Sequence, residues 1–233
     1  EIEAELKACG AKYLKLDSDD LIEQVAGALA DEKAVGWMQG RMEFGPRALG
    51  GRSIIADPRS PAMQKQLNLK VKYRESFRPF APSVLREDVG EWFEHETDSP
   101  YMLLVADLQK DKRLATTAEE EDLFGIDKLN IPRSSVPAIT HVDYSARIQT
   151  VHADTNSRYH AVISRFKEKT GCPMLVNTSF NVRGEPIICT PTDAFKCFMG
   201  TELDVLAVGN YLLVKEEQDQ TLKENYEERY ELD

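Results

Sequence analysis

The spacing of apolar positions predicts helices that alternate with short strands. Between residues 18 and 31, Leu21, Ile22, Val25 and Leu29 recur every three or four positions, which is the period of a helix with one buried face. The same pattern, with turn residues at its ends, predicts further helices over residues 60–70, 88–93, 156–169 and 190–199.

Short apolar runs predict the strands. They cover residues 34–38, 80–85, 101–108, 138–142, 147–152, 174–177, 186–189, 205–208 and 211–215. Pro79 and Pro82 place the strand over 80–85 at a sheet edge at best, because proline has no N–H to donate to a neighbouring strand. Strands and helices mix without a strict βαβ rhythm, so we expect an α/β fold built on one mixed sheet.

Two segments do not fit this pattern. Residues 109–136 hold an acidic run and few aromatic residues, which favours a mobile insertion or lid. The charged tail over 216–233 is expected to be helical or frayed. The chain begins at Glu1 without an initiator Met or a signal-peptide pattern, so we expect it to be a piece of a longer protein.

The composition is that of a globular protein. Of 233 residues, 42% are hydrophobic and 30% charged, which excludes collagen-like and wholly disordered chains. No apolar run approaches the roughly 18 to 20 residues of a membrane helix, so no membrane association is expected. The four cysteines form no Cys-x-x-Cys pair and lie at no zinc spacing to the four histidines. We therefore expect free thiols, no metal site in this chain, and the reducing cytoplasm as its compartment.

The charge is unevenly distributed. The net charge of −11 argues against non-specific binding of nucleic acid. Residues 41–80 nevertheless hold nine basic and three acidic side chains, a local charge of +6. Such a basic region indicates a site for a compact anion such as a phosphate or a nucleotide, although a solvated basic face is equally compatible with it.

The segment over residues 40–53 combines glycines with arginines. Its glycines permit a tight turn in which backbone N–H groups approach an anion, and Arg41, Arg47 and Arg52 offer forked donors suited to phosphate. Glu43 can hold one of these arginines in place. The segment is neither a Walker A loop nor a dinucleotide fingerprint, and a plain turn with surface arginines remains the alternative.

A second basic segment runs over residues 71–82. On an extended chain, Lys72, Arg74 and Ser76 would point to one face. The repulsion between two neighbouring cations would be relieved when an anion binds between them. The alternative is a strand whose Lys and Arg side chains point into solvent.

A third segment, residues 174–186, carries an apolar strand directly into short polar residues. At the end of a buried strand, Asn177, Ser179 and Asn181 could orient phosphate or carbonyl oxygens. The alternative is a turn that caps a loop. In the segment over 137–149, we interpret His141 as structural rather than as a base, and Arg147 as the better candidate for contact with an anion.

Taken in order, these segments resemble the C-terminal domain of the carbamoyltransferase family, which includes antibiotic O-carbamoyltransferases and nodulation-factor carbamoyltransferases. The resemblance spans residues 13–215, and the run Gly-Arg-Met-Glu-Phe-Gly-Pro-Arg-Ala-Leu-Gly-x-Arg-Ser carries most of it. That domain is in turn similar to the YrdC-like fold of threonylcarbamoyl-adenylate synthases, a twisted mixed parallel and antiparallel sheet with flanking helices. The Lys-x-Arg and Ser-x-Asn signature of that fold is matched by Lys72, Arg74, Ser179 and Asn181.

The resemblance implies an activity. In such proteins the YrdC-like domain makes carbamoyl-adenylate from carbamoyl phosphate and ATP, which arrives with Mg²⁺. The intermediate passes to an N-terminal domain, where an acceptor hydroxyl is carbamoylated. That domain carries a metal-binding histidine motif and the acceptor site, and this chain matches neither. By the same resemblance, Lys72, Arg74, Arg147, Ser179 and Asn181 would be catalytic. Substrate and ATP binding would fall to Arg41, Arg47, Arg52, Arg78 and Asn177. The alternative is a non-catalytic module of the same fold that binds a nucleotide or RNA.

Overall fold

A mixed sheet organises the protein. The structure is a computed structural model that describes residues 1–115, 117–125, 131–223 and 226. Its described strands are β1 (Leu14–Lys15), β2 (Val35–Met38), β3 (Arg52–Ala56), β4 (Ala81–Leu85), β5 (Leu104–Asp107), β6 (Ser145–Val151), β7 (Met174–Ser179), β8 (Val205–Val208) and β9 (Tyr211–Val214). They lie in the order β1-β9-β8-β2-β3-β7-β4-β6-β5, with β2/β8 and β4/β6 parallel and the other pairs antiparallel. The predicted mixed α/β architecture is confirmed.

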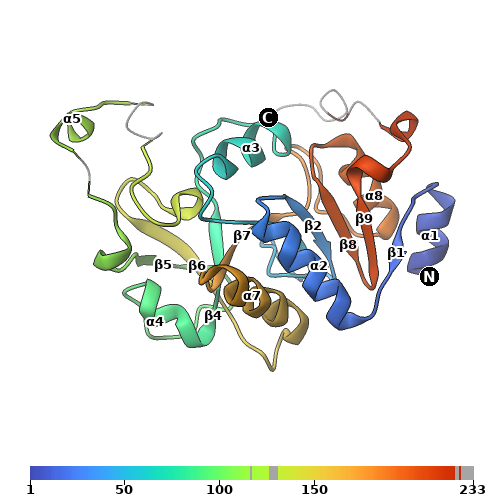
Figure 1. The fold of residues 1–233 in the computed structure, drawn as a ribbon, viewed down its shortest axis with the longest axis horizontal. Coiled ribbons are helices and arrows are strands. Elements are labelled where there is room, and N and C mark those ends of the chain that lie inside the picture. The colour runs from blue at the N-terminus through green and yellow to red at the C-terminus, as the bar shows by residue number, and fades with distance from the viewer. Residues whose placement is uncertain (116, 126–130, 224–225, 227–233) are drawn as a thin grey trace.

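Helices cover both faces of the sheet. The described ones are α1 (Ile2–Ala8), α2 (Ser18–Ala30), α3 (Met63–Lys70), α4 (Val89–Trp92), α5 (Ala118–Glu121), α7 (Ser157–Thr170) and α8 (Pro191–Gly200). Figure 1 shows α2 and α7 side by side across one face, and these two helices pack against each other. Helix α8 also packs on β2 and β8, and every residue of both strands is buried, so α8 covers the other face.

The long helices begin and end at residues suited to that role. The Asn156 side chain caps α7 by accepting from the N–H of Tyr159, and Gly171 ends the helix in the left-handed region with φ of 76°. Helix α8 begins with a reciprocal capping box between Thr190 and Asp193. These local signals explain why the predicted helices over 156–169 and 190–199 are confirmed almost to the residue.

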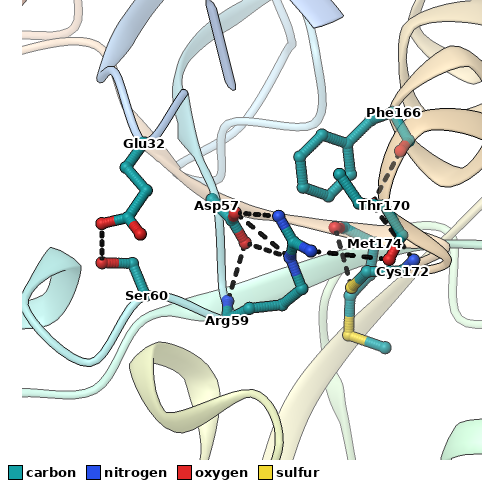
Figure 2. Close-up of polar contacts among 8 residues, drawn as sticks. All are labelled: Glu32, Asp57, Arg59, Ser60, Phe166, Thr170, Cys172 and Met174. Carbon is teal, nitrogen blue, oxygen red and sulfur yellow. Dashed lines mark hydrogen bonds and ion pairs between the residues drawn. The ribbon is translucent and has the colours of Figure 1, made fainter. Parts of the chain in front are cut away.

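A polar cluster ties the end of β3 to the far end of α7 (Figure 2). The buried carboxylate of Asp57 accepts hydrogen bonds from the backbone and the guanidinium of Arg59, with 2.6 Å between Oδ2 and Nη2. Arg59 in turn donates to the carbonyl of Thr170 and lies over the ring of Phe166. The β3–α3 connection is thereby anchored to the α7–β7 turn, which holds β3 beside β7, a strand that carries part of the site.

The expectation that residues 80–85 form an edge strand is wrong. Strand β4 lies inside the sheet between β7 and β6. The N–H of Leu85 points toward β7 and donates to the carbonyl of Pro173, so by alternation the nitrogen of Pro82 faces the other side. Pairing with β6 begins only at Ser83. The missing donor of Pro82 therefore falls just before that ladder, and the proline is tolerated in a central strand.

Other predicted strands are also corrected. Residues 138–142 form a 3₁₀ turn (Pro137–Ile139) and a loop, because the carbonyl of Ala138 accepts from Phe80 and the chain then reverses into β6. Residues 186–189 run without strand pairing after the turn at Gly184. Strand β3 and helix α1 were not predicted. Strand β3 begins at Arg52, which the sequence pattern places in the glycine-rich segment over residues 40–53, and no strand is expected there.

The acidic insertion and the tail are described only in part. Within residues 109–136 the structure places the 3₁₀ turn Lys110–Lys112 and helix α5; residues 116 and 126–130 lie outside the described part, and the expected mobility stays a prediction. The tail begins with the 3₁₀ turns Lys215–Glu217 and Gln220–Leu222, and most of the remainder is likewise not described. Among the described residues, no helix has the length and apolar character needed to span a bilayer.

Candidate functional site

A hollow of about 280 Å³ opens where β4, β6 and β7 meet the glycine-rich loop. Strand β7 contributes three consecutive residues to it, while β4 and β6 contribute one residue each. It is lined by Pro46, Arg47, Ala48, Arg74, Arg78, Pro79, Phe80, Ala81, Met102, Arg147, Asn177, Thr178 and Ser179. Four of these side chains are arginines and none is acidic, so the hollow has a strongly positive lining.

The glycine-rich loop over residues 40–51 is held together by a carboxylate. The Oε1 atom of Glu43 accepts from the backbone N–H groups of Leu49 at 2.6 Å and Gly51 at 2.7 Å. Glu43 therefore anchors the backbone of the loop, whereas from the sequence we expected it to hold an arginine side chain. These N–H groups already bind a carboxylate, so the loop contributes its Arg47 side chain to the hollow rather than an anion-binding turn.

Gly50 sets the path of this loop. Its φ of 100° is one that L side chains rarely adopt, and a Cβ atom there would come within 2.3 Å of the Tyr159 ring. Tyr159 belongs to α7 and is fully buried. The loop therefore packs directly on that helix, which fixes where Arg47 enters the hollow.

Arg52 and Arg41 are not among the residues that line the hollow. The guanidinium of Arg52 is buried and donates to the carbonyls of Gln39, Gly40, Gly51 and Cys189. Arg52 thus joins the two ends of the glycine-rich loop to the segment before α8. Arg41 is exposed and lines a separate groove on the other side of the loop, near the start of α7.

The basic segment after α3 is a turn and not the extended chain that the sequence suggested. Asn68 on α3 is fully buried, and its Nδ2 atom donates to the carbonyls of Ser76 and Arg78. The Oδ1 atom of Asn68 accepts from Nε of Arg74 at 2.6 Å, and the guanidinium of Arg74 lies 4.9 Å from the centre of the Phe80 ring. One buried amide therefore shapes the turn and aims Arg74 at the hollow.

Lys72 lies in a second hollow of about 400 Å³ that shares Arg74, Arg78, Thr178 and Ser179 with the first. Its Nζ atom donates to the carbonyl of Asn181 at 2.8 Å, to Oδ1 of Asn181 at 2.9 Å and to the carbonyl of Ser179. Burial, with a smaller contribution from the charge of Arg74, lowers the pKa of Lys72 to about 7. Lys72, Ser179 and Asn181 are therefore in direct contact, as the signature residues would be in one site.

The charged forms of the arginines in the hollow are disfavoured by burial and by their mutual repulsion. Burial lowers the pKa of Arg147, and the nearby charge of Arg47 lowers it further. Burial lowers the pKa of Arg74 to about 10, with a further contribution from Arg78. The Nε atoms of Arg47 and Arg147 are buried and have no hydrogen-bond partner among the described residues. Such an arrangement is relieved by an anion that accepts from several guanidinium groups at once.

A clamp of three polar side chains fixes the loop to the sheet. The Nδ2 atom of Asn177 donates to the carbonyl of Ala48 at 3.0 Å, and Nε2 of Gln149 donates to the carbonyl of Leu49 at 3.0 Å. Asn177 also donates to Oε1 of Gln149 and to Ser83, all within a buried network. Asn177 was expected to donate to a ligand oxygen, but its donor is engaged with protein oxygens.

Most of the site residues expected from the sequence come together. Arg47, Arg74, Arg78, Arg147, Asn177 and Ser179 line the first hollow, and Lys72 and Asn181 line the adjoining one. The sequence missed the supporting role of Asn68, Ser83 and Gln149. A polar residue next to Leu67 on the apolar side of the predicted helix was an available signal for Asn68. The described residues contain no group of three His, Cys, Asp or Glu side chains able to hold a metal ion.

Comparison with known proteins gives a consistent result. The family model described as Carbamoyltransferase C-terminus matches residues 26–215. An uncharacterized protein of Synechocystis sp. is 60% identical over the whole chain, which covers 38% of that protein. Nodulation protein NolNO of Sinorhizobium fredii is 43% identical over 92% of the chain and 29% of its own length. The 3'-hydroxymethylcephem-O-carbamoyltransferase of Amycolatopsis lactamdurans is 36% identical over 73% of the chain and 28% of its own length. The chain therefore spans about a third of the length of these relatives.

Proposed function

Because the chain belongs to the carbamoyltransferase family by its match to the C-terminal domain, we propose that its two joined hollows activate a carbamoyl group for transfer. The observation that carries the proposal is the set of four arginines around a hollow of about 280 Å³ with no acidic side chain in its lining. That lining suits a phosphate-bearing substrate of small volume.

The proposed substrates are carbamoyl phosphate and ATP, and the product is carbamoyl-adenylate. Water first cleaves carbamoyl phosphate to carbamate and inorganic phosphate. A carbamate oxygen then attacks the α-phosphorus of ATP, and the bond to the β-phosphate breaks with release of pyrophosphate. Mg²⁺ accompanies ATP as part of the substrate complex.

This chemistry needs positioning and positive charge more than a covalent nucleophile. Arg47, Arg74 and Arg147 come from three separate segments and are held by the Glu43 anchor, the Asn68 amide and β6. In this proposal they bind phosphoryl oxygens as charge develops on them. Lys72 holds Ser179 and Asn181 in the orientation that presents them to the substrate.

A whole enzyme would use this chain as its activating part. We propose that carbamoyl-adenylate is passed to an N-terminal domain, where an acceptor hydroxyl is carbamoylated, since the curated relatives are about three times as long as the chain. The four free cysteines support the reducing cytoplasm as the proposed compartment.

The test is exchange of labelled pyrophosphate into ATP by the 233-residue chain. Exchange is expected to require carbamoyl phosphate and Mg²⁺, and calorimetry is expected to show binding of ATP. Absence of both exchange and ATP binding would contradict the proposal.

The alternative of an RNA-binding module is less well supported. Three arginines of the basic region over residues 41–80, Arg47, Arg74 and Arg78, line one small hollow, and the net charge of −11 opposes a nucleic-acid partner. A gel-shift assay with tRNA at two salt concentrations separates the two functions. Strong, salt-sensitive binding without pyrophosphate exchange would favour the RNA module.

A further inference from the structure

The hydrogen bonds of the polar clamp fix the orientation of the Asn177 amide. Its Nδ2 atom faces the carbonyl of Ala48, which can only accept. Gln149 is oriented in the same way, because its Nε2 atom faces the carbonyl of Leu49 and its Oε1 atom therefore faces Asn177. Exchanging the two ends of the Asn177 amide would place an oxygen against a carbonyl oxygen, so the position of Oδ1 is determined.

That Oδ1 atom is an acceptor without a donor. Asn177 is only 1% exposed, and its Oδ1 atom has no hydrogen-bond partner among the described residues. The Nε atoms of Arg47 and Arg147 are unpaired donors beside the same hollow. The three residues that carry these two donors and this acceptor line the same hollow. Leaving buried polar groups unpaired is costly, which makes them informative about the ligand.

The combination distinguishes between classes of ligand. A carboxylate or a fully ionised phosphoryl group only accepts hydrogen bonds, so either would satisfy the arginines and leave Oδ1 of Asn177 unpaired. A carbamoyl group carries an oxygen acceptor and an –NH₂ donor on the same carbon atom. It can therefore pair with an arginine on one side and with Asn177 on the other.

We propose that Oδ1 of Asn177 accepts a hydrogen bond from the –NH₂ of a carbamoyl group bound in the arginine-lined hollow, and that Asn177 thereby selects carbamoyl over acyl groups that end in a methyl. The proposal rests on the proposed function, since it requires a carbamoyl-bearing substrate. It makes Asn177 a specificity residue in addition to its role in the clamp. A methyl group in the same place would leave the amide oxygen buried and unpaired.

The test compares two stable ligands on the 233-residue chain by calorimetry. Phosphonoacetamide carries –NH₂ on its carbonyl carbon, and 2-oxopropylphosphonate carries a methyl there with the same phosphonate and similar shape. The wild-type chain is expected to bind the amide about ten-fold more tightly or better, as for loss of a buried hydrogen bond. Equal affinities for the two phosphonates would overturn the inference and leave the proposed function standing. No binding of either phosphonate or of ATP would overturn the proposed function, and the inference with it.

Variants add a second, independent readout. In Asn177→Leu the ratio of the two affinities is expected to fall to about one, because the acceptor is gone. Ser83→Ala is the matched control: it removes a partner of the same clamp and keeps Oδ1, so it weakens both ligands equally and preserves the ratio. If the affinity ratio stays at its wild-type value in Asn177→Leu, or falls to about one in Ser83→Ala, Asn177 is not the group that accepts the hydrogen bond from the –NH₂. The comparison in the wild-type chain decides the question even where the leucine variant does not fold.

Discussion

Arg47 and Arg147 lie a hundred positions apart in the sequence and line the same hollow, where the charge of one lowers the pKa of the other. One comes from a glycine-rich loop and the other from β6. Both Nε atoms are buried without partners among the described residues. Burial and the charge of Arg47 both disfavour the charged form of Arg147, and the proposed anion would offset that cost.

The first prediction concerns the opposite effects of Arg147 on stability and on anion affinity. Replacing Arg147 with Met removes the repulsion and keeps an unbranched side chain of similar length. We expect the thermal midpoint of the ligand-free chain not to fall, while the affinity for pyrophosphate drops by about 2 kcal/mol, or roughly 30-fold, as for a lost charge-assisted contact. Calorimetry and a melting curve measure the two effects.

The control for charge alone is Arg165→Met. Arg165 lies on the exposed part of α7 and does not line either hollow, so the variant loses the same formal charge away from the site. Its pyrophosphate affinity is expected to stay within about two-fold of wild type, since exposed charges are largely screened. An Arg147→Met chain that binds as tightly as wild type would remove Arg147 from the site.

The second prediction concerns Lys72 and pH. Burial lowers its pKa to about 7 in the folded chain, from an ordinary value of 10.5. Between these two values the unfolded chain holds a proton that the folded chain has released, so stability should rise with pH across that window. The slope for one such group is at most about 1.4 kcal/mol per pH unit. Urea unfolding of the wild type and of Lys72→Met at pH 6, 7.5 and 9 measures it.

The comparison with the variant isolates Lys72 from other titrating groups. The difference in free energy of unfolding between wild type and Lys72→Met should grow in favour of the wild type from pH 7.5 to 9. A difference that is constant from pH 6 to 9 would mean that Lys72 remains charged, held by the oxygens of Ser179 and Asn181.

The third prediction separates structural arginines from ligand-binding ones. Arg52→Lys is expected to lower the free energy of unfolding by about 2 kcal/mol, because one ammonium cannot reproduce a guanidinium that donates to four carbonyls. Arg41→Lys, in an exposed position of the same loop, should change stability by less than about 0.5 kcal/mol. If Arg52→Lys were as stable as wild type but bound ATP more weakly, Arg52 would bind the ligand, as expected from the sequence, and would not be a structural residue.

The sequence selected residues that the structure brings together, but it did not predict their geometry. The arginines could be selected from the basic region, whereas Lys72, Ser179 and Asn181 were selected as site residues through the resemblance to the carbamoyltransferase family. The supporting contacts could not be selected, since Asn68, Gln149 and Glu43 act through backbone groups whose positions depend on the tertiary fold. For the same reason, alternation along an assumed strand misplaced Lys72 and Arg74, which lie on a turn shaped by an amide from α3.

The sheet shows the same limit. Helices with clear caps were predicted closely, whereas β4 was assigned to an edge because Pro82 was judged by its residue type alone. Whether a proline is tolerated depends on which side its nitrogen faces and where the neighbouring ladder begins. Neither quantity can be read from local sequence.

The last prediction tests how the glycine-rich loop is held on α7. Gly50→Ala places a Cβ within 2.3 Å of the buried Tyr159 ring at a backbone φ of 100°, so both a clash and a strained conformation result. We expect a loss of about 3 kcal/mol in the free energy of unfolding, measured by urea titration. Gly45→Ala is the matched control in the same loop, since nothing lies within 4 Å of its Cβ position, and it should change stability by less than about 0.5 kcal/mol. Because the loop also carries Arg47, Gly50→Ala should weaken pyrophosphate binding wherever the variant stays folded, and Gly45→Ala should not. Equal stability and equal affinity in the two variants would show that the loop is not seated on Tyr159.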